Sequence, residues 1–170
     1  MTVSHEIVGQ FVDAAVLDSQ LANRLLQKHP ELKSATLLGE SLLHFLAIEN
    51  YPNGIRFLVK RGWSIDECEE DGTTPLISAV FVGAFDAAVA LLELGADPNA
   101  VSDTYDNPLH CAISDGNIKL VDLLLKGGAT PLYKMNCGTT AFDVLPNNKP
   151  EKNATIRAML REHGWVAPDE

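Results

Sequence analysis

The side chains best able to act as bases, nucleophiles or metal ligands are five histidines and three cysteines. They are His5, His29, His44, His110 and His163, and Cys68, Cys111 and Cys137. His110 and Cys111 could form a base and a nucleophile, but adjacent residues of a helix do not face each other. No CxxC pair or His/Cys cluster has the spacing of a zinc site, and no glycine-rich phosphate loop occurs. We therefore predict no catalytic residue, no metal site and no cofactor.

The elements that hold these residues repeat every 33 residues. Four polar residues that can cap helices share this period, and so do three glycines. The capping residues are Ser41, Thr74, Asn107 and Thr140, and the glycines are Gly62, Gly95 and Gly128. A fixed period of this length indicates one supersecondary unit stacked on copies of itself.

Residues 71–103 show what one unit must be. Asp71 and Gly72 form a turn signal, and Thr74 followed by Pro75 can cap and begin a helix. The apolar run that follows ends at Gly83, and a second helical run, FDAAVALLEL, precedes a glycine. In the next unit an asparagine and a proline take the places of the threonine and proline. Each unit is predicted to contain a turn, two helices and an exit loop.

These segments resemble the ankyrin repeat. The matching stretches are ESLLHFLA, DGTTPLISA, DNPLHCA, LLELGADPNA and LLLKGGATP, and the resemblance covers roughly residues 37–143. It implies an all-α ankyrin-repeat solenoid of about five helix-turn-helix units. In this family the histidine at the positions of His44 and His110 forms hydrogen bonds between neighbouring turns, which implies a scaffold role for both.

We predict a single domain over residues 1–170. It has an N-terminal cap at about 4–36, repeats at about 37–70, 71–103 and 104–136, and a C-terminal cap repeat at about 137–165. In the N-terminal cap, helices are expected at about 4–16 and 19–28, with Asp18 or Ser19 as the helix cap. In the C-terminal cap, Pro146 should cut the first helix short, and a final helix at about 153–163 should end at Gly164.

Charge and composition narrow the possible partners. The net charge is −10 and the pI is about 4.8, which argues against nucleic acid and favours a basic protein. No apolar run approaches the roughly 18 residues of a membrane span, and the N-terminus does not resemble a signal peptide. The odd number of cysteines fits reduced thiols. We expect a cytoplasmic protein that is a monomer when free.

The resemblance also implies which residues face a partner. Ankyrin arrays usually bind proteins with the turn tips and the ends of the first helices, which line the concave face. The corresponding residues here are Glu40, Glu49, Glu70, Asp71, Thr73, Phe81, Val82, Asp103, Thr104, Tyr105, Asp106 and Asp115. Between Gly62 and Gly116 there are eleven acidic residues and no Lys or Arg. Turn conformation alone favours about one Asp at each tip, which leaves most of this excess unexplained.

Phe81 and Val82 are apolar where the surface ends of such helices are normally polar. They could form an interface patch, or Phe81 could fold back onto a neighbouring unit; helix phase does not decide between these. Two functions remain open for a non-enzymatic protein. In the first, the acidic concave face binds, and inhibits or neutralises, a basic protein, for example as an immunity-type inhibitor. In the second, the chain is a generic scaffold or regulatory adaptor that binds through an apolar patch around Phe81 and Val82.

Overall fold

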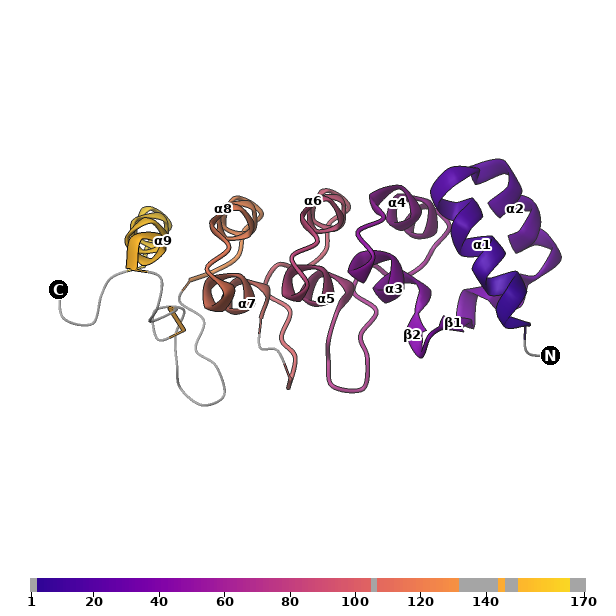
Figure 1. The fold of residues 1–170 in the computed structure, drawn as a ribbon, viewed down its shortest axis with the longest axis horizontal. Coiled ribbons are helices and arrows are strands. Elements are labelled where there is room, and N and C mark those ends of the chain that lie inside the picture. The colour runs from indigo at the N-terminus through magenta and orange to yellow at the C-terminus, as the bar shows by residue number, and fades with distance from the viewer. Residues whose placement is uncertain (1–2, 105–106, 132–143, 146–149, 166–170) are drawn as a thin grey trace.

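The computed structural model describes residues 3–104, 107–131, 144–145 and 150–165. The described part is an elongated stack of antiparallel helix pairs (Figure 1). The first helices of the pairs form one layer and the second helices form another, while the loops between pairs project to one side (Figure 1). The predicted all-α repeat solenoid is confirmed.

The N-terminal cap is a helix pair without a preceding hairpin. It consists of α1 (His5–Leu17) and α2 (Ser19–Lys28), followed by a short 3-10 helix, η1 (Pro30–Ser34). Asp18 Oδ1 accepts hydrogen bonds from the backbone N–H groups of Gln20 and Leu21, at 3.0 and 3.1 Å. Asp18 is therefore the cap of α2, which decides between the two residues that the sequence left open.

A small β-hairpin leads into the first full repeat. Strands β1 (Thr36–Leu37) and β2 (Glu40–Ser41) pair antiparallel. The two loop residues, Leu38 and Gly39, both have positive φ, at 56° and 94°. Two successive positive φ angles are typical of a tight two-residue hairpin loop, but glycine or asparagine is the usual first residue.

Three helix pairs follow, one for each predicted repeat. They are α3 (Leu42–Ile48) with α4 (Pro52–Lys60), α5 (Pro75–Phe81) with α6 (Phe85–Glu93), and α7 (Pro108–Asp115) with α8 (Ile118–Lys126). The predicted caps are in place: Thr74 Oγ1 accepts from Ile77 N at 3.4 Å, and Asn107 Oδ1 accepts from His110 N at 2.9 Å. The capping side chains satisfy N–H groups that a helix start would otherwise leave without a partner.

The last helix, α9 (Pro150–Glu162), begins three residues earlier than predicted. Its first residue is a proline, which is favoured there because the missing N–H has no acceptor in a first turn. The helix ends before Gly164, as expected, and this glycine has a φ of 89°. The shortened helix predicted before Pro146 lies largely outside the described residues, so the fifth pair stays a prediction.

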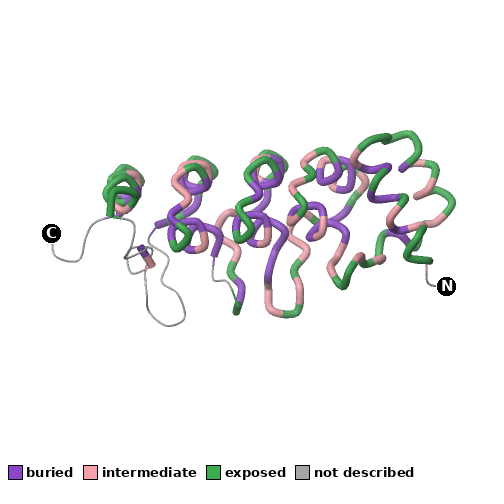
Figure 2. The backbone as a smooth tube through the Cα atoms, viewed as in Figure 1, coloured by how far each residue is buried: buried purple, intermediate pink, exposed green. Residues whose placement is uncertain are grey.

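A continuous apolar core runs between the two helix layers (Figure 2). In the repeats it is made chiefly of fully buried leucines such as Leu46, Leu58 and Leu91. At the N-terminal end, the buried rings of Phe11 and Trp63 stack with centroids 6.1 Å apart. Because each pair packs only on its neighbours, the turns and helix ends along one side are left for display.

Candidate protein-binding groove

The turn before α5 and the ends of α3 and α5 enclose a groove of about 260 Å³, here called the acidic groove. Strand β2, the α4–α5 turn, α3 and α5 all contribute to it. Its lining residues are Glu40, Ile48, Glu69, Asp71, Thr73, Ser78, Phe81 and Val82. The structure thus brings together five of the residues that the sequence assigned to partner binding.

One wall of the acidic groove is apolar and accessible. Phe81 is 57% exposed and Val82 is 49% exposed, and Ile48 lies one 33-residue period before Phe81. Phe81 therefore does not fold away into the core of a neighbouring repeat, which resolves the two alternatives that helix phase left open. Burial of such side chains would favour association, because apolar surface is removed from water.

The other wall carries carboxylates that lie close to one another. The pKa of Glu40 is raised above its ordinary value of 4.5, first because of burial and then because its carboxyl group hydrogen-bonds to Glu69 and feels that residue's charge. His44 opposes the shift. Two carboxylates at this separation cannot both be ionised without repulsion, so this wall favours a proton or a cation.

Glu69 is the one acidic residue of the groove that sequence reasoning did not assign to binding, and Ile48 and Ser78 were not assigned either. Glu69 is half-buried, and its Oε1 lies 4.0 Å from Nδ1 of His44. Glu69 belongs to the acidic run ECEED, which was the available sign of a binding role. The repeat register instead assigned the next residue, Glu70, to binding. A second hollow of about 490 Å³ adjoins the groove through Glu69 and Asp71 and is lined also by Glu67 and Glu70.

Asp71 has a role within the fold as well as a place in the groove. Its Oδ1 accepts from the backbone N–H of Thr73 at 2.9 Å, and its carbonyl oxygen accepts from Asp103 N at 2.8 Å. Hydrogen bonds from Thr104 first, and then from Thr73, lower the pKa of Asp71 below its ordinary value of 3.8. The preference of turns for Asp therefore accounts for this acid in part.

Thr73 lines the groove and also has a structural role. It is buried, and its hydroxyl donates to Ser102 Oγ at 3.0 Å, which in turn accepts from Thr104 N at 3.0 Å. Its side chain therefore links two successive turns, and its assignment to partner binding stays a prediction. The repeat period locates a turn but does not tell which of its side chains point inward.

The remaining predicted residues are spread around the groove. Glu49 and Glu70 are exposed, and so are Asp103 and Thr104 in the turn before α7 and Asp115 at the end of α7. Tyr105 and Asp106 lie outside the described residues. The assignment of these residues to partner binding stays a prediction.

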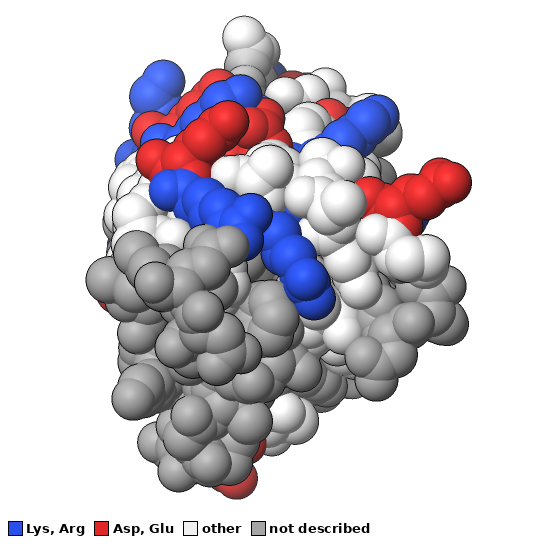
Figure 3. Space-filling view, turned by 90° about the vertical axis from the view of Figure 1, so that its left-hand side faces the viewer, with Lys and Arg blue, Asp and Glu red and all other residues white. Residues whose placement is uncertain are grey.

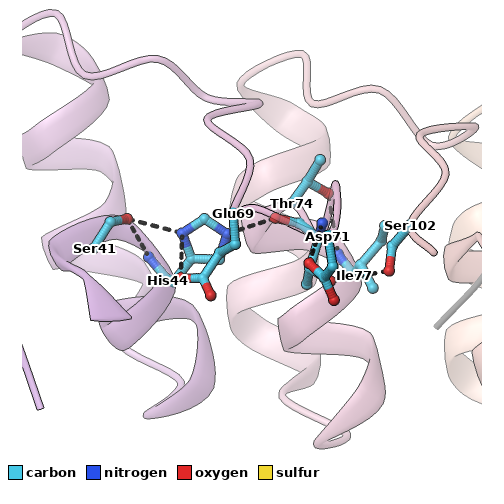
Figure 4. Close-up of polar contacts among 8 residues, drawn as sticks. Ser41, His44, Glu69, Asp71, Thr74, Ile77 and Ser102 are labelled. Atoms are coloured by element: carbon cyan, nitrogen blue, oxygen red, sulfur yellow. Dashed lines mark hydrogen bonds and ion pairs between the residues drawn. The ribbon is translucent and has the colours of Figure 1, made fainter. Parts of the chain in front are cut away.

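His44 is a structural residue, as the resemblance implied. The ring is buried, its Nδ1 lies 2.8 Å from Ser41 Oγ, and its Nε2 lies 2.9 Å from the carbonyl oxygen of Thr73 (Figure 4). Both ring nitrogens are thus engaged within the fold. His110 is also buried, and Cys111 packs half-buried against the core. Within the described ranges, no group of three or more His, Cys, Asp or Glu residues could hold a metal ion.

The C-terminal end of the stack differs from the acidic groove. Around α9, Lys and Arg side chains lie beside Asp and Glu (Figure 3), and Arg157 and Arg161 are exposed, which suits the solvent-facing side of a terminal helix. In the part of the chain that the structure describes, no helix is long and apolar enough to cross a membrane.

Comparison with known proteins gives one family. A model described as ankyrin repeats (3 copies) matches residues 12–102, and another, ankyrin repeats (many copies), matches residues 83–125. The chain is 32% identical over 112 residues to neurogenic locus notch homolog protein 1 of Danio rerio, covering 65% of the chain and 5% of that protein. It is 43% identical over 75 residues to the 2-5A-dependent ribonuclease of Mus musculus, covering 44% of the chain and 10% of the relative. The chain thus spans a small part of each of these relatives.

Proposed function

This chain belongs to the ankyrin repeat family, whose repeats mediate protein–protein interaction, and we propose that its acidic groove binds a basic protein. The family's repeats are generally non-catalytic, and we propose that binding is also the function here. The observation that carries the proposal is the groove itself, which is lined both by the interacting carboxyl groups of Glu40 and Glu69 and by the exposed Phe81.

The two walls together suit lysine and arginine side chains. The cationic group would offset the repulsion between Glu40 and Glu69, and the aliphatic stem would cover Phe81 and Val82. An aromatic ring face also attracts a cation that lies over it. A partner that presents such side chains therefore gains from both walls, whereas a purely apolar partner would leave the carboxylates without a counter-charge.

Charges beyond the groove support the same partner. The stretch from Gly62 to Gly116 contains eleven acidic residues and no Lys or Arg. Exposed acids on the next repeat, Asp103 and Asp115, extend the surface to a size that suits a protein. A negatively charged surface of this kind steers a positively charged protein towards it and makes their association dependent on salt.

Inhibition or neutralisation is the outcome that we propose for such a complex. A cationic enzyme, for example a nuclease, uses a basic surface to hold an anionic substrate, and an array of carboxylates can cover that surface. We propose a cytoplasmic location for the complex, because three cysteines without a CxxC pair fit reduced thiols.

The alternative is a generic scaffold or regulatory adaptor that binds through the apolar patch around Phe81 and Val82. Their exposure favours it. The two candidates differ in salt dependence: binding through the carboxylates weakens as salt rises, whereas binding through the apolar wall survives high salt and fails in Phe81→Ala.

Capture of partners on the immobilised protein, at low and at high salt, tests the proposal. The informative variant is Glu70→Arg with Asp103→Arg, because both side chains are exposed beside the groove. Its matched control, Asp86→Arg with Glu151→Arg, makes the same charge change on α6 and α9. We expect one basic protein that is lost at high salt and in the first variant only. Undiminished capture by the first variant would rule out the acidic groove as its binding site.

A further inference from the structure

A second groove of about 350 Å³ lies where the N-terminal cap packs on α4, and we call it the basic groove. The end of α1 and the start of α2 form one side of it, and the outer face of α4 forms the other. Its lining residues are Ala15, Val16, Leu17, Ser19, Asn53, Arg56, Phe57, Lys60 and Arg61. Three of these nine residues are cationic and none is acidic, which is the reverse of the acidic groove.

The two arginines of the basic groove are held in place by neighbouring side chains. Arg56 and Lys60 are four residues apart and share one face of α4. Arg56 Nη2 lies 2.6 Å from Glu93 Oε2 on α6. The Nε atom of Arg61 donates to Asn23 Oδ1 at 2.9 Å, while its guanidinium lies 4.7 Å from the centroid of the Phe57 ring. Binding would therefore cost little side-chain ordering at the two arginines.

Charge is segregated along the described chain. All six Lys and Arg residues between positions 3 and 104 fall within 24–61, a stretch that holds three acids. These six are Arg24, Lys28, Lys33, Arg56, Lys60 and Arg61. A local excess of cations in a chain of net charge −10 creates a region that attracts negative charge.

The basic groove also has an apolar edge. Leu17, the last residue of α1, is 83% exposed, and the preceding Val16 is half-buried. Leu17 contributes little to the core at this exposure, so its apolar surface is available to a ligand. Glu93 already pairs with Arg56, so a ligand that fits must combine negative charge, chiefly for Lys60 and Arg61, with an apolar side chain for Leu17.

We infer that the basic groove binds an acidic segment of a partner protein that carries apolar side chains among its carboxylates. This ligand is opposite in charge to the one proposed for the acidic groove, so the two sites take different proteins. The acidic groove is formed by turns and by the first helices α3 and α5, whereas the basic groove is formed by α1, α2 and the second helix α4 (Figure 1). Both can therefore be occupied together, and the protein can bridge a basic and an acidic partner.

Titration of the ¹⁵N-labelled protein with a synthetic peptide of glutamates interrupted by two leucines tests the inference. Two companion peptides carry serine for leucine, or lysine for glutamate. We expect saturable amide shift changes around Leu17, Asn53 and Lys60 with the first peptide and much weaker ones with the other two. Shift changes that map elsewhere, or an absence of saturable changes, would overturn the inference.

Two variants and two matched controls sharpen the result. Lys60→Glu and Leu17→Ser alter exposed side chains of the basic groove and should weaken peptide binding roughly tenfold or more. Lys126→Glu changes the exposed lysine two periods later, and Leu38→Ser changes an equally exposed leucine outside the groove; both should bind as the wild type does. An equal loss of peptide binding in the controls and the variants would contradict a specific binding site.

Sedimentation velocity distinguishes a second copy from a separate partner. If the wild type self-associates and Lys60→Glu abolishes this, the acidic surface of another copy occupies the basic groove. That result would overturn the assignment of the groove to a separate protein. The basic groove is also independent of the proposed function. Lys60→Glu should leave capture of a basic partner unchanged, so either proposal can fail alone.

Discussion

The Nε2 atom of His44 lies 2.9 Å from the carbonyl oxygen of Thr73, and this contact ties the first helix of one repeat to the turn of the next (Figure 4). A carbonyl oxygen can only accept, so Nε2 carries the proton. The other ring nitrogen, Nδ1, then accepts from the hydroxyl of Ser41 at 2.8 Å. The same carbonyl oxygen also accepts from the backbone N–H of Glu69. His44 therefore positions the turn that carries the acidic groove.

Replacement of this imidazole should destabilise the whole stack. His44→Ala loses two hydrogen bonds and leaves a cavity at a buried site, so we expect the free energy of unfolding to fall by roughly 2–4 kcal/mol. Urea denaturation followed by circular dichroism measures it. His5→Ala, at an exposed position, is the control and should change the value by less than about 0.5 kcal/mol. Similar values for both variants would contradict the structural role.

Asn50 gives a second link between repeats. It has a φ of 57° where the following repeats have Gly83 and Gly116, and its Oδ1 accepts from Ala87 N at 2.8 Å. Asn50→Gly should lose only this hydrogen bond, about 1 kcal/mol. Asn50→Ala should also force alanine into the left-handed region and lose about 1 kcal/mol more. In the same denaturation assay, the free energy of unfolding should be highest for the wild type, lower for Asn50→Gly and lowest for Asn50→Ala. Equal values for the two variants would contradict the explanation from backbone conformation.

These two residues show how far the sequence alone can lead. The caps formed by Thr74 and Asn107 and the scaffold role of His44 follow from short motifs whose partners are nearby in the chain or recur with the period. The hydrogen bond from Ala87 to Asn50 joins residues 37 positions apart. Its existence depends on how one repeat rotates against the next, which no local pattern specifies.

The candidate site was predictable in the same partial way. The register placed Glu40, Asp71, Phe81 and Val82 on the displayed side, and the structure brings all four into one groove. The register did not indicate that Thr73 is buried, because neighbouring turn residues share the same period and composition. The basic groove depends on the packing of α1 against α4, whose sequences carry no common pattern.

Leu38 occupies a conformation that suits its side chain poorly. Its φ is 56° in the hairpin loop, and the side chain is 79% exposed, so packing offsets little of the strain. Leu38→Asn creates the Asn-Gly pair that such loops favour and should raise the free energy of unfolding by about 1 kcal/mol. Leu17→Asn changes an equally exposed leucine within a helix and should bring no gain. A gain in both variants would point to exposed apolar surface instead of backbone strain.

The pKa of Glu40 leads to a prediction about pH. Burial and the neighbouring Glu69 raise it above 4.5, so the folded protein holds this proton more tightly than the unfolded chain does. The stability that the protonated group contributes is complete below pH 4.5 and is lost as the pH rises through the raised pKa. Glu40→Gln cannot ionise. It should therefore be more stable than the wild type at pH 7, and the difference should shrink towards pH 4.

Asp71→Asn should change the melting temperature at pH 7 in the direction opposite to Glu40→Gln. Thermal denaturation of both variants at a series of pH values measures these effects. Hydrogen bonds from Thr104 and Thr73 lower the pKa of Asp71 below 3.8, so its ionised form stabilises the fold above that pH, and this contribution is lost as the pH falls through the lowered pKa. The variant should melt below the wild type at pH 7 and approach it in acid. If both variants shifted the melting temperature in the same direction at pH 7, the general reduction of negative charge would explain both shifts. The repulsion between Glu40 and Glu69 would then no longer support a cationic ligand for the acidic groove.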